Sequence, residues 1–125
     1  KNIKILGDRI LHIGYVDTFE EYASWLWKSD ILPVTNIQDF FGASIMEAVY
    51  CECIPILPNR LTYPELFPTE NLYQNENELY EKTNMVLKHF QSEKKEELQK
   101  MASKFDWSTM APKYDKEMKL VLNEK

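Results

Sequence analysis

The sequence predicts a doubly wound α/β fold, in which helices flank a parallel sheet. Three short apolar runs, Ile10–Ile13, Ile31–Val34 and Ile54–Leu57, are continuous rather than alternating, which is typical of strands buried on both faces. Segments with apolar residues at helical spacing separate these runs. Because strands that alternate with helices form parallel sheets, this order predicts an α/β fold.

Two further segments are expected to be strands. Ile3–Leu6 precedes the first run, and Leu72–Tyr73 is a short terminal candidate. Pro33 and Pro55 count against the strands that contain them, because each proline removes one hydrogen-bond donor from the ladder.

The first helix is predicted to begin beside Thr18, because Thr18 and Glu21 have capping-box spacing. Apolar residues then fall on one helical face at Phe19, Tyr22, Ala23, Leu26 and Trp27. Other helices are expected over residues 44–51, 76–90 and 93–104, with a single turn at 64–67 and a last helix that carries Met110, Tyr114, Met118, Val121 and Leu122 at helical spacing.

The bulk composition is that of one ordinary globular domain spanning residues 1–125. Hydrophobic residues make up 44% of the chain and charged residues 28%. The formal net charge of −5 argues against this piece binding a nucleic-acid backbone by itself. No apolar run approaches the ~18 residues that a membrane span needs, and no signal peptide opens the chain.

The two cysteines indicate a reducing, cytoplasmic setting. Cys51 and Cys53 flank a single residue, which is too close for an easy disulfide, and two cysteines are too few for a disulfide scaffold. A metal site formed with His12 is the alternative, but one such pair falls far short of a zinc site. We therefore expect two buried thiols and no metal.

The segment from Asp39 to Ala48 contains the candidate functional residues. It places two carboxylates, Asp39 and Glu47, eight residues apart on either side of Gly42. A strand, a glycine turn and a helix N-terminus direct free N–H groups toward a crevice, where they suit a phosphate. Carboxylates beside that crevice accept hydrogen bonds from sugar hydroxyls. The spacing alone leaves a second interpretation open, in which Asp39 only caps the helix and Glu47 faces solvent.

The wider pattern resembles a known family. Residues 39–48, followed by the Cys53-Ile54-Pro55-Ile56 strand, are similar to the donor-binding motif of family 4 GT-B glycosyltransferases. A longer set of segments resembles the tRNA-queuosine α-mannosyltransferase subgroup: residues 12–16, 40–42, 46–51, 63–68 and 105–107. The resemblance spans nearly the whole chain and implies a Rossmann-like sheet.

The resemblance implies roles for the two acids. Asp39 matches the acid that contacts the hydroxyls of the transferred sugar, and Glu47 matches the acid that holds the ribose hydroxyls. These two are the residues expected to act in catalysis. The implied reaction transfers a hexose from a nucleotide-diphosphate sugar, with retention of configuration and no metal or other cofactor. The implied donor is GDP-mannose or another nucleotide-activated hexose, and a queuosine-modified tRNA is the implied acceptor.

Other positions match substrate-binding parts of the family's motif. Phe40, Phe41 and Gly42 match the loop over the sugar and phosphates, and Ala43 and Ser44 match the residues whose N–H groups meet the diphosphate. The loop against the nucleobase corresponds to Gly14, Tyr15 and Val16.

Glu65 is a further candidate. It follows the Ile54–Leu57 strand and is therefore expected at the carboxyl edge of the sheet, near donor phosphates or the acceptor cleft. The alternative, a helical turn framed by Pro64 and Pro68, stays open.

Two departures from the family's pattern bear on activity. Asp39 stands where the family has Glu, which shortens its reach by one methylene, and Glu52 stands where the family has Gly. A left-handed backbone at position 52 is strained with Glu. These departures favour the competing hypothesis of a non-catalytic, nucleotide-binding or regulatory module descended from a glycosyltransferase. A flavodoxin-like signalling domain is a third class, but the usual acidic cluster at the first strand end is missing.

The chain is expected to be a fragment. It begins Lys1-Asn2-Ile3 and runs almost at once into strand-like sequence. Glycosyltransferases of the resembled family also contain an N-terminal acceptor domain and a basic, glycine-rich loop for the diphosphate. We therefore expect a donor-binding lobe whose acceptor domain, with any tRNA contact, lies outside this sequence.

Overall fold

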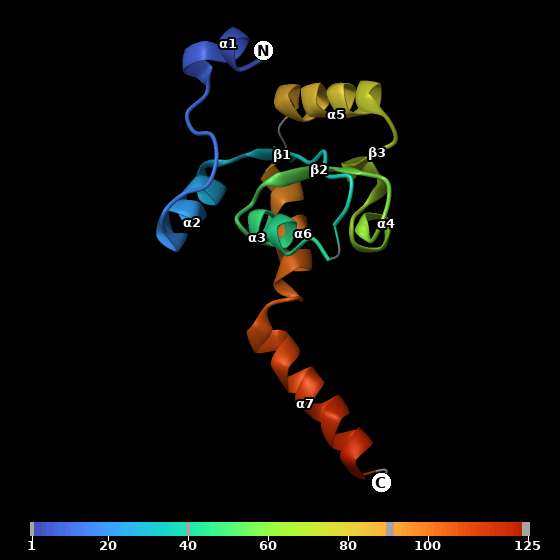
Figure 1. The fold of residues 1–125 in the computed structure, drawn as a ribbon. Coiled ribbons are helices and arrows are strands. Elements are labelled where there is room, and N and C mark those ends of the chain that lie inside the picture. The colour runs from blue at the N-terminus through green and yellow to red at the C-terminus, as the bar shows by residue number, and fades with distance from the viewer. Residues whose placement is uncertain (1, 40, 90–91, 124–125) are drawn as a thin grey trace.

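The computed structural model describes residues 2–39, 41–89 and 92–123 and shows an α/β fold (Figure 1). Its parallel sheet has the order β1-β2-β3, formed by Ile31–Pro33, Ile54–Pro58 and Leu72–Tyr73. The helices are α1 (Asn2–Leu6), α2 (Phe19–Lys28), α3 (Ala43–Tyr50), α4 (Tyr63–Leu66), α5 (Glu76–Lys88), α6 (Ser92–Ser103) and α7 (Trp107–Asn123), with 3₁₀ turns η1 (Gly7–Arg9) and η2 (Thr69–Asn71). This arrangement confirms the predicted fold class.

Helices cover both faces of the sheet. In Figure 1, α5 lies on one face, while α3 and α6 lie together on the other. The helix α3 buries Ile45, Met46, Ala48 and Val49, and α6 contributes Leu98 and Ala102 to the same core. Leu98 and Ala102 point inward from a helix whose other residues are mostly charged or polar. None of the helices in the described ranges is both long and apolar enough to cross a membrane.

The central strand β2 tolerates a proline in its middle. Every residue of β2 is buried, including Pro55. On one side the strand bonds to the β1 segment through Ile54 N, which donates to the Asp30 carbonyl at 2.9 Å. The carbonyl of Pro55 faces the other side and accepts from Asn71 Nδ2 at 2.8 Å. Strand β3 begins only at Leu72, which pairs with Leu57. No described strand therefore lies opposite Pro55 on that side, and the missing N–H of the proline costs no hydrogen bond in the ladder.

Two of the predicted strands are wrong. Ile3–Leu6 lies in the helix α1, and Ile10–Ile13 is an irregular segment. An apolar run becomes a strand only where a neighbouring strand satisfies its N–H and C=O groups, and no described strand lies beside either segment. A four-residue apolar run also cannot be told from a helix by periodicity, and local helical bonds satisfy the backbone of α1 instead.

Side-chain caps mark the starts of two helices, and the cap of α2 is the one that the sequence predicted. Thr18 Oγ1 accepts from Glu21 N at 3.1 Å at the start of α2. Asn75 Oδ1 accepts from Glu78 N at 3.1 Å at the start of α5, and Glu78 in turn accepts from Gln74 N. Each cap satisfies N–H groups that have no partner within the helix.

Candidate functional site

A glycine turn connects β1 to α3, as the motif predicted. Gly42 is the N-cap of α3, with φ 76°, a left-handed backbone that favours glycine. A Cβ at this position would lie 3.3 Å from Tyr63 Cε1 and 3.4 Å from Ile45 Cδ1. Both the backbone conformation and the close packing therefore require glycine here. Ala43 and Ser44 follow as the first two residues of α3, with exposed side chains.

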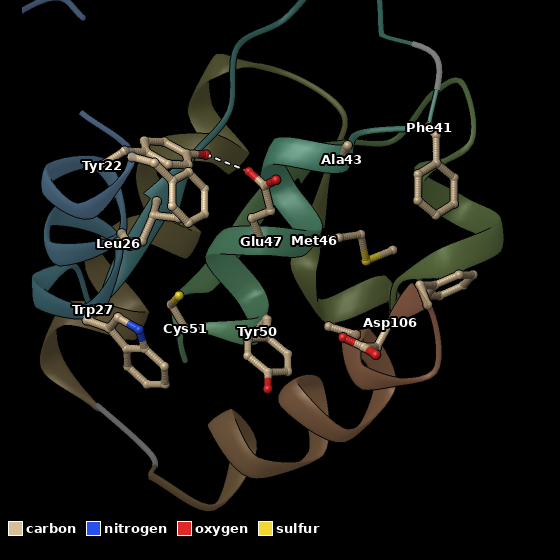
Figure 2. Close-up of a pocket in the computed structure, with 14 residues that line it drawn as sticks. Tyr22, Leu26, Trp27, Phe41, Ala43, Met46, Glu47, Tyr50, Cys51 and Asp106 are labelled. Atoms are coloured by element: carbon tan, nitrogen blue, oxygen red, sulfur yellow. Dashed lines mark hydrogen bonds between the residues drawn. The ribbon is translucent and has the colours of Figure 1, made fainter. Parts of the chain in front are cut away.

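Glu47 lies on the exposed face of α3 and is held by a tyrosine of α2. Tyr22 Oη donates to Glu47 Oε2 at 2.9 Å (Figure 2). Burial, together with the hydrogen bond to Glu47 and its charge, raises the pKa of Tyr22 to about 12. The hydroxyl therefore remains a donor throughout the physiological pH range, and it fixes the direction of the carboxylate.

Asp39 is held in a similar way from a different element. Tyr63 Oη donates to Asp39 Oδ2 at 2.9 Å, and Asn36 Nδ2 donates to the same oxygen at 3.4 Å. Tyr63 is the first residue of α4 and is fully buried. Burial, followed by the hydrogen bond to Asp39, raises the pKa of Tyr63 to about 12, so this hydroxyl also remains protonated.

A cavity of about 450 Å³ opens between α2, α3 and the end of α6 (Figure 2). Its charged lining residues are Glu47 and Asp106, and Ala43 and Cys51 lie among the others. Its walls are largely aromatic: Phe19, Tyr22, Trp27, Phe41, Tyr50 and Phe105. Small-molecule sites are typically concave and apolar with a few placed polar groups, and this cavity fits that description.

The cavity brings together some of the predicted site residues. Phe41, Ala43 and Glu47 all line it, and Phe41 packs edge-to-face on Phe105 with ring centroids 5.2 Å apart. Asp39 does not line the cavity, because its side chain turns toward Tyr63. Phe40 lies outside the described residues.

The predicted nucleobase loop lies elsewhere. Gly14, Tyr15 and Val16 belong to the irregular segment before α2 and do not line the cavity. Tyr15 is fully exposed, and His12 stays beside this loop by contacting the Gly14 carbonyl oxygen and stacking on Trp25. Glu65 is exposed on α4 and also lies outside the cavity. Roles for these residues stay predictions.

A second, smaller cavity of about 300 Å³ lies at the carboxyl ends of the strands. It is lined by residues that follow each of the three strands, including Thr35, Arg60 and Gln74, and by Asn75 and Glu76 at the start of α5. The Arg60 guanidinium donates to the carbonyl of Asn36, which joins the loop after β2 to the loop after β1. Ligands of doubly wound sheets bind at this edge.

Two described residues other than glycine have a left-handed backbone: Glu52, between α3 and β2, and Leu61, in the loop after β2. Glu52 has φ 69°, which is the left-handed backbone considered for the position where the resembled family has glycine. Leu61 has φ 59° and lies between Arg60 and Tyr63. Strained backbone is found preferentially at functional sites, and Leu61 lies beside the candidate site.

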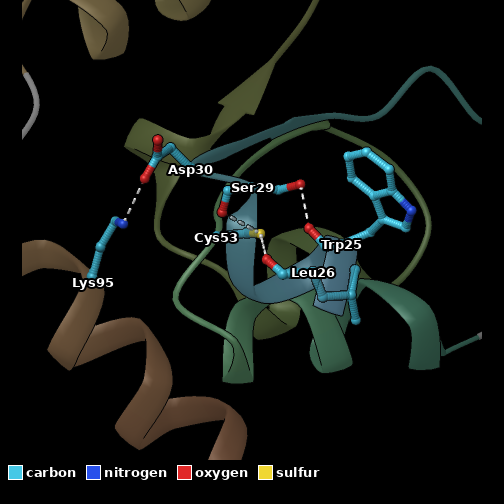
Figure 3. Close-up of polar contacts among 6 residues, drawn as sticks. All are labelled: Trp25, Leu26, Ser29, Asp30, Cys53 and Lys95. Atoms are coloured by element: carbon cyan, nitrogen blue, oxygen red, sulfur yellow. Dashed lines mark hydrogen bonds and ion pairs between the residues drawn. The ribbon is translucent and has the colours of Figure 1, made fainter. Parts of the chain in front are cut away.

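The two cysteines are buried free thiols, as expected. Cys53 Sγ donates to the carbonyl oxygens of Ser29 at 2.9 Å and Leu26 at 3.4 Å, at the end of α2 (Figure 3). Burial raises the pKa of the Cys53 thiol to about 11, so it is a poor nucleophile. Across the described ranges, no cluster of three or more His, Cys, Asp or Glu side chains is arranged to hold a metal ion.

The sequence did not predict that three residues would hydrogen-bond to the candidate acids: Tyr22, Tyr63 and Asn36. Tyr22 was assigned to the apolar face of α2, where a buried hydroxyl needs a partner, and this need was the available signal. Nothing in the sequence near Tyr63 or Asn36 indicated Asp39 as their partner.

Comparison with known proteins relates this site to an enzyme class. Over 77 residues, the chain is 43% identical to the tRNA-queuosine alpha-mannosyltransferase of Drosophila melanogaster. The chain is related to a glycosyltransferase. The match covers 62% of this chain and 20% of that protein, so the chain spans about a fifth of the relative's length. Any stretch of 77 residues in a chain of 125 must include residues 49–77, whatever its starting point. The matched stretch therefore contains β2, α4 and β3.

The other comparisons add no assignment. No family model matches the chain, and no solved structure matches it. The predicted relation to glycosyltransferases is thus confirmed as a class, while membership of the GT-B family 4 group stays a prediction.

Proposed function

We propose that this chain is the nucleotide-sugar-binding lobe of a retaining GT-B glycosyltransferase. The observation that carries the proposal is the placement of Glu47 in an aromatic cavity, with its carboxylate directed by Tyr22. The identity to a mannosyltransferase supports the same class of reaction. The nucleoside of the donor occupies the cavity, where its base contacts aromatic rings and its ribose hydroxyls donate to Glu47.

The sugar and diphosphate lie outside the cavity, next to the glycine turn. Glu47 and Asp106 make the cavity acidic, which disfavours phosphate inside it. The N–H groups of Ala43 and Ser44, at the start of α3, point beyond the helix and suit the diphosphate. Asp39 accepts hydrogen bonds from the hydroxyls of the transferred sugar. Catalysis rests on stabilising the departing diphosphate, with no metal required.

The relative's name supports a proposal for the donor and the acceptor. Its name states mannose transfer to queuosine in tRNA. We propose GDP-mannose as the donor and a queuosine-modified tRNA as the acceptor, bound mostly by an N-terminal domain beyond this sequence. The net charge of −5 on this chain agrees with a tRNA contact made elsewhere, in a cytoplasmic enzyme.

A nuclear magnetic resonance titration of the chain with GDP, UDP, ADP and GDP-mannose tests the proposal. Millimolar binding, about −4 kcal/mol, is detectable by this method. We expect shifts at Gly42, Ser44 and Glu47 with GDP and GDP-mannose. A preference for UDP would keep the glycosyltransferase and replace the mannosyl assignment. The absence of shifts with every nucleotide and nucleotide sugar would contradict donor binding by this chain.

One observation favours a second function, that of a nucleotide-binding module without catalysis. Asp39 is one methylene shorter than the family's Glu, and its Oδ2 already accepts hydrogen bonds from Tyr63 and Asn36. Such a module binds GDP and GDP-mannose equally, because it makes no contact with the sugar. An enzyme binds the two with different affinities and transfers mannose to tRNA, which mass spectrometry of the tRNA nucleosides detects.

A further inference from the structure

Asp39 is a short side chain on an irregular loop. It lies between β1 and α3, outside any helix or strand. A side chain on such a loop is not oriented by the regular geometry of a helix or strand. Its usefulness in holding a sugar hydroxyl therefore depends on side chains that restrain it.

Tyr63 contacts this loop at two points. Its ring is fully buried and lies against Gly42, where a Cβ would approach Cε1 to 3.3 Å. Its hydroxyl donates to Asp39 Oδ2 at 2.9 Å. One rigid ring thus contacts both the turn at Gly42 and the carboxylate three residues earlier.

The loop that carries Tyr63 is itself tied to the Asp39 loop. The Arg60 guanidinium donates to the carbonyl of Asn36, and the amide of Asn36 donates to Asp39 Oδ2 at 3.4 Å. Leu61, between Arg60 and Tyr63, has the left-handed φ of 59°. A strained backbone persists only where surrounding contacts hold it, so the loop after β2 is held in one conformation.

We infer that Tyr63 is a positioning residue, which directs the Asp39 carboxylate toward the transferred sugar. This inference rests on the proposed function, because it assigns the sugar contact to Asp39. Tyr22 is its counterpart at the ribose, through Glu47. The two tyrosines therefore act on different parts of the donor: Tyr63 affects recognition of the sugar, and Tyr22 affects recognition of the nucleoside.

Removing each hydroxyl separates the two effects. Dissociation constants for GDP, GDP-mannose, UDP and UDP-glucose are measured for the wild type, Tyr63→Phe and Tyr22→Phe. We expect Tyr63→Phe to weaken binding of the nucleotide sugar about tenfold while binding of its nucleoside diphosphate is unchanged. Tyr22→Phe is expected to weaken the binding of the nucleotide sugar and of its nucleoside diphosphate by the same factor. A purely structural role for Tyr63 would not change the ratio of the two affinities.

Asp39→Asn provides an independent check that does not alter the buried ring. It should reproduce the selective loss, and adding Tyr63→Phe to it should cause little further loss, because Tyr63 acts through the Asp39 carboxylate. Thermal melting of each variant confirms folding before binding is measured.

The outcomes distinguish a failure of the proposed donor binding from a failure of the positioning role of Tyr63. A wild-type chain that binds none of the four ligands overturns the proposed function and this inference with it. A wild type that binds, together with a Tyr63→Phe variant that keeps both affinities or loses both equally, overturns the positioning role alone. Additive losses from Asp39→Asn and Tyr63→Phe also overturn it.

Discussion

Single side chains organise this site through hydrogen bonds from tyrosine to carboxylate. Tyr22 holds Glu47, and Tyr63 holds Asp39, each with an oxygen–oxygen distance of 2.9 Å. A hydrogen bond to a charged acceptor is worth about 1.5–3 kcal/mol, about twice a neutral one. At the residue scale, the candidate site therefore consists of two restrained acids, Asp39 before the turn at Gly42 and Glu47 on the helix α3 that follows it.

Glu47→Ala tests the ribose contact. We expect it to weaken nucleotide binding about tenfold or more without unfolding the chain, because Glu47 is exposed and its loss removes charge-assisted hydrogen bonds to the ribose. Titration with GDP measures the affinity, and circular dichroism measures the folding. Glu96→Ala, at an exposed position on α6 outside the cavity, is the matched control. Unchanged affinity in Glu47→Ala would defeat the ribose role.

Glu52→Gly tests the backbone strain. The φ of 69° at Glu52 costs about 1 kcal/mol for a residue with a Cβ, so we expect glycine to raise the free energy of unfolding by about that amount. Urea unfolding measures the change. Glu81→Gly, at an exposed position inside α5, should do the opposite and lower it by about 1 kcal/mol. If both variants were destabilised alike, position 52 would carry no strain.

Contacts between elements connect α2 and α6 to the sheet beside the candidate site. Cys53, at the start of β2, donates through its thiol to the carbonyls that end α2. Nearby, Lys95 of α6 forms an ion pair with Asp30 at 3.0 Å, beside β1 (Figure 3). At the element scale, these bonds connect α2, α6 and the sheet, and they keep Tyr22 of α2 within reach of Glu47 on α3.

The buried thiol predicts a loss of stability at alkaline pH. The pKa of Cys53 rises from its ordinary value of 9.0 to about 11 on folding. Below pH 9 both states keep the proton, so the thiol adds no pH dependence there. Between about pH 9 and pH 11 the unfolded chain loses the proton while the folded chain keeps it, so the free energy of unfolding falls by about 2 kcal/mol.

Urea unfolding of the wild type and Cys53→Ala at pH 8 and pH 11 measures this effect. The variant is expected to be less stable at pH 8, because it loses packing, but its stability should fall less between the two pH values. Lysines and the other residues titrate in both proteins. The decrease in the free energy of unfolding from pH 8 to pH 11 is therefore compared between the wild type and Cys53→Ala, and the difference measures the contribution of the thiol. An equal fall in both proteins would mean that Cys53 does not couple to folding.

The whole molecule consists of a packed centre with elements that extend from it. Figure 1 shows α7 projecting away from the sheet, and α1 lying apart from the central layers. Apolar side chains of α7 are exposed, among them Trp107 at 71% and Leu122 at 71%. The residues that hold the two acids all belong to the centre or to α2, so α7 is not needed for the tyrosine–carboxylate pairs.

Hydrogen exchange should reveal this division. A lone helix of 17 residues is marginal in water, so we expect the amides of α7 to exchange about 100-fold or more faster than those of β2 and α3. Mass spectrometry of peptides from each element measures the rates. Equal protection in α7 and β2 would show that α7 packs against something in solution.

The sequence by itself determined the local features of this protein. It placed β1, β2, β3 and the starts of α2 and α5 correctly, because apolar runs and caps act between residues close in the chain. It also located the turn at Gly42, the position of the left-handed backbone at Glu52 and the relation to glycosyltransferases. The pairing of acid and tyrosine was not predictable in this way.

Only the tertiary structure decided which distant residues meet. Tyr22 and Glu47 are 25 residues apart, and Asp39 and Tyr63 are 24 residues apart, so no local pattern records these contacts. The same limit explains the error at Ile10–Ile13, whose apolar residues favour a strand although no neighbouring strand pairs with it in the described structure. A strand and a restrained carboxylate share one physical requirement: the hydrogen-bond partner comes from a remote part of the chain, which folding alone brings into place.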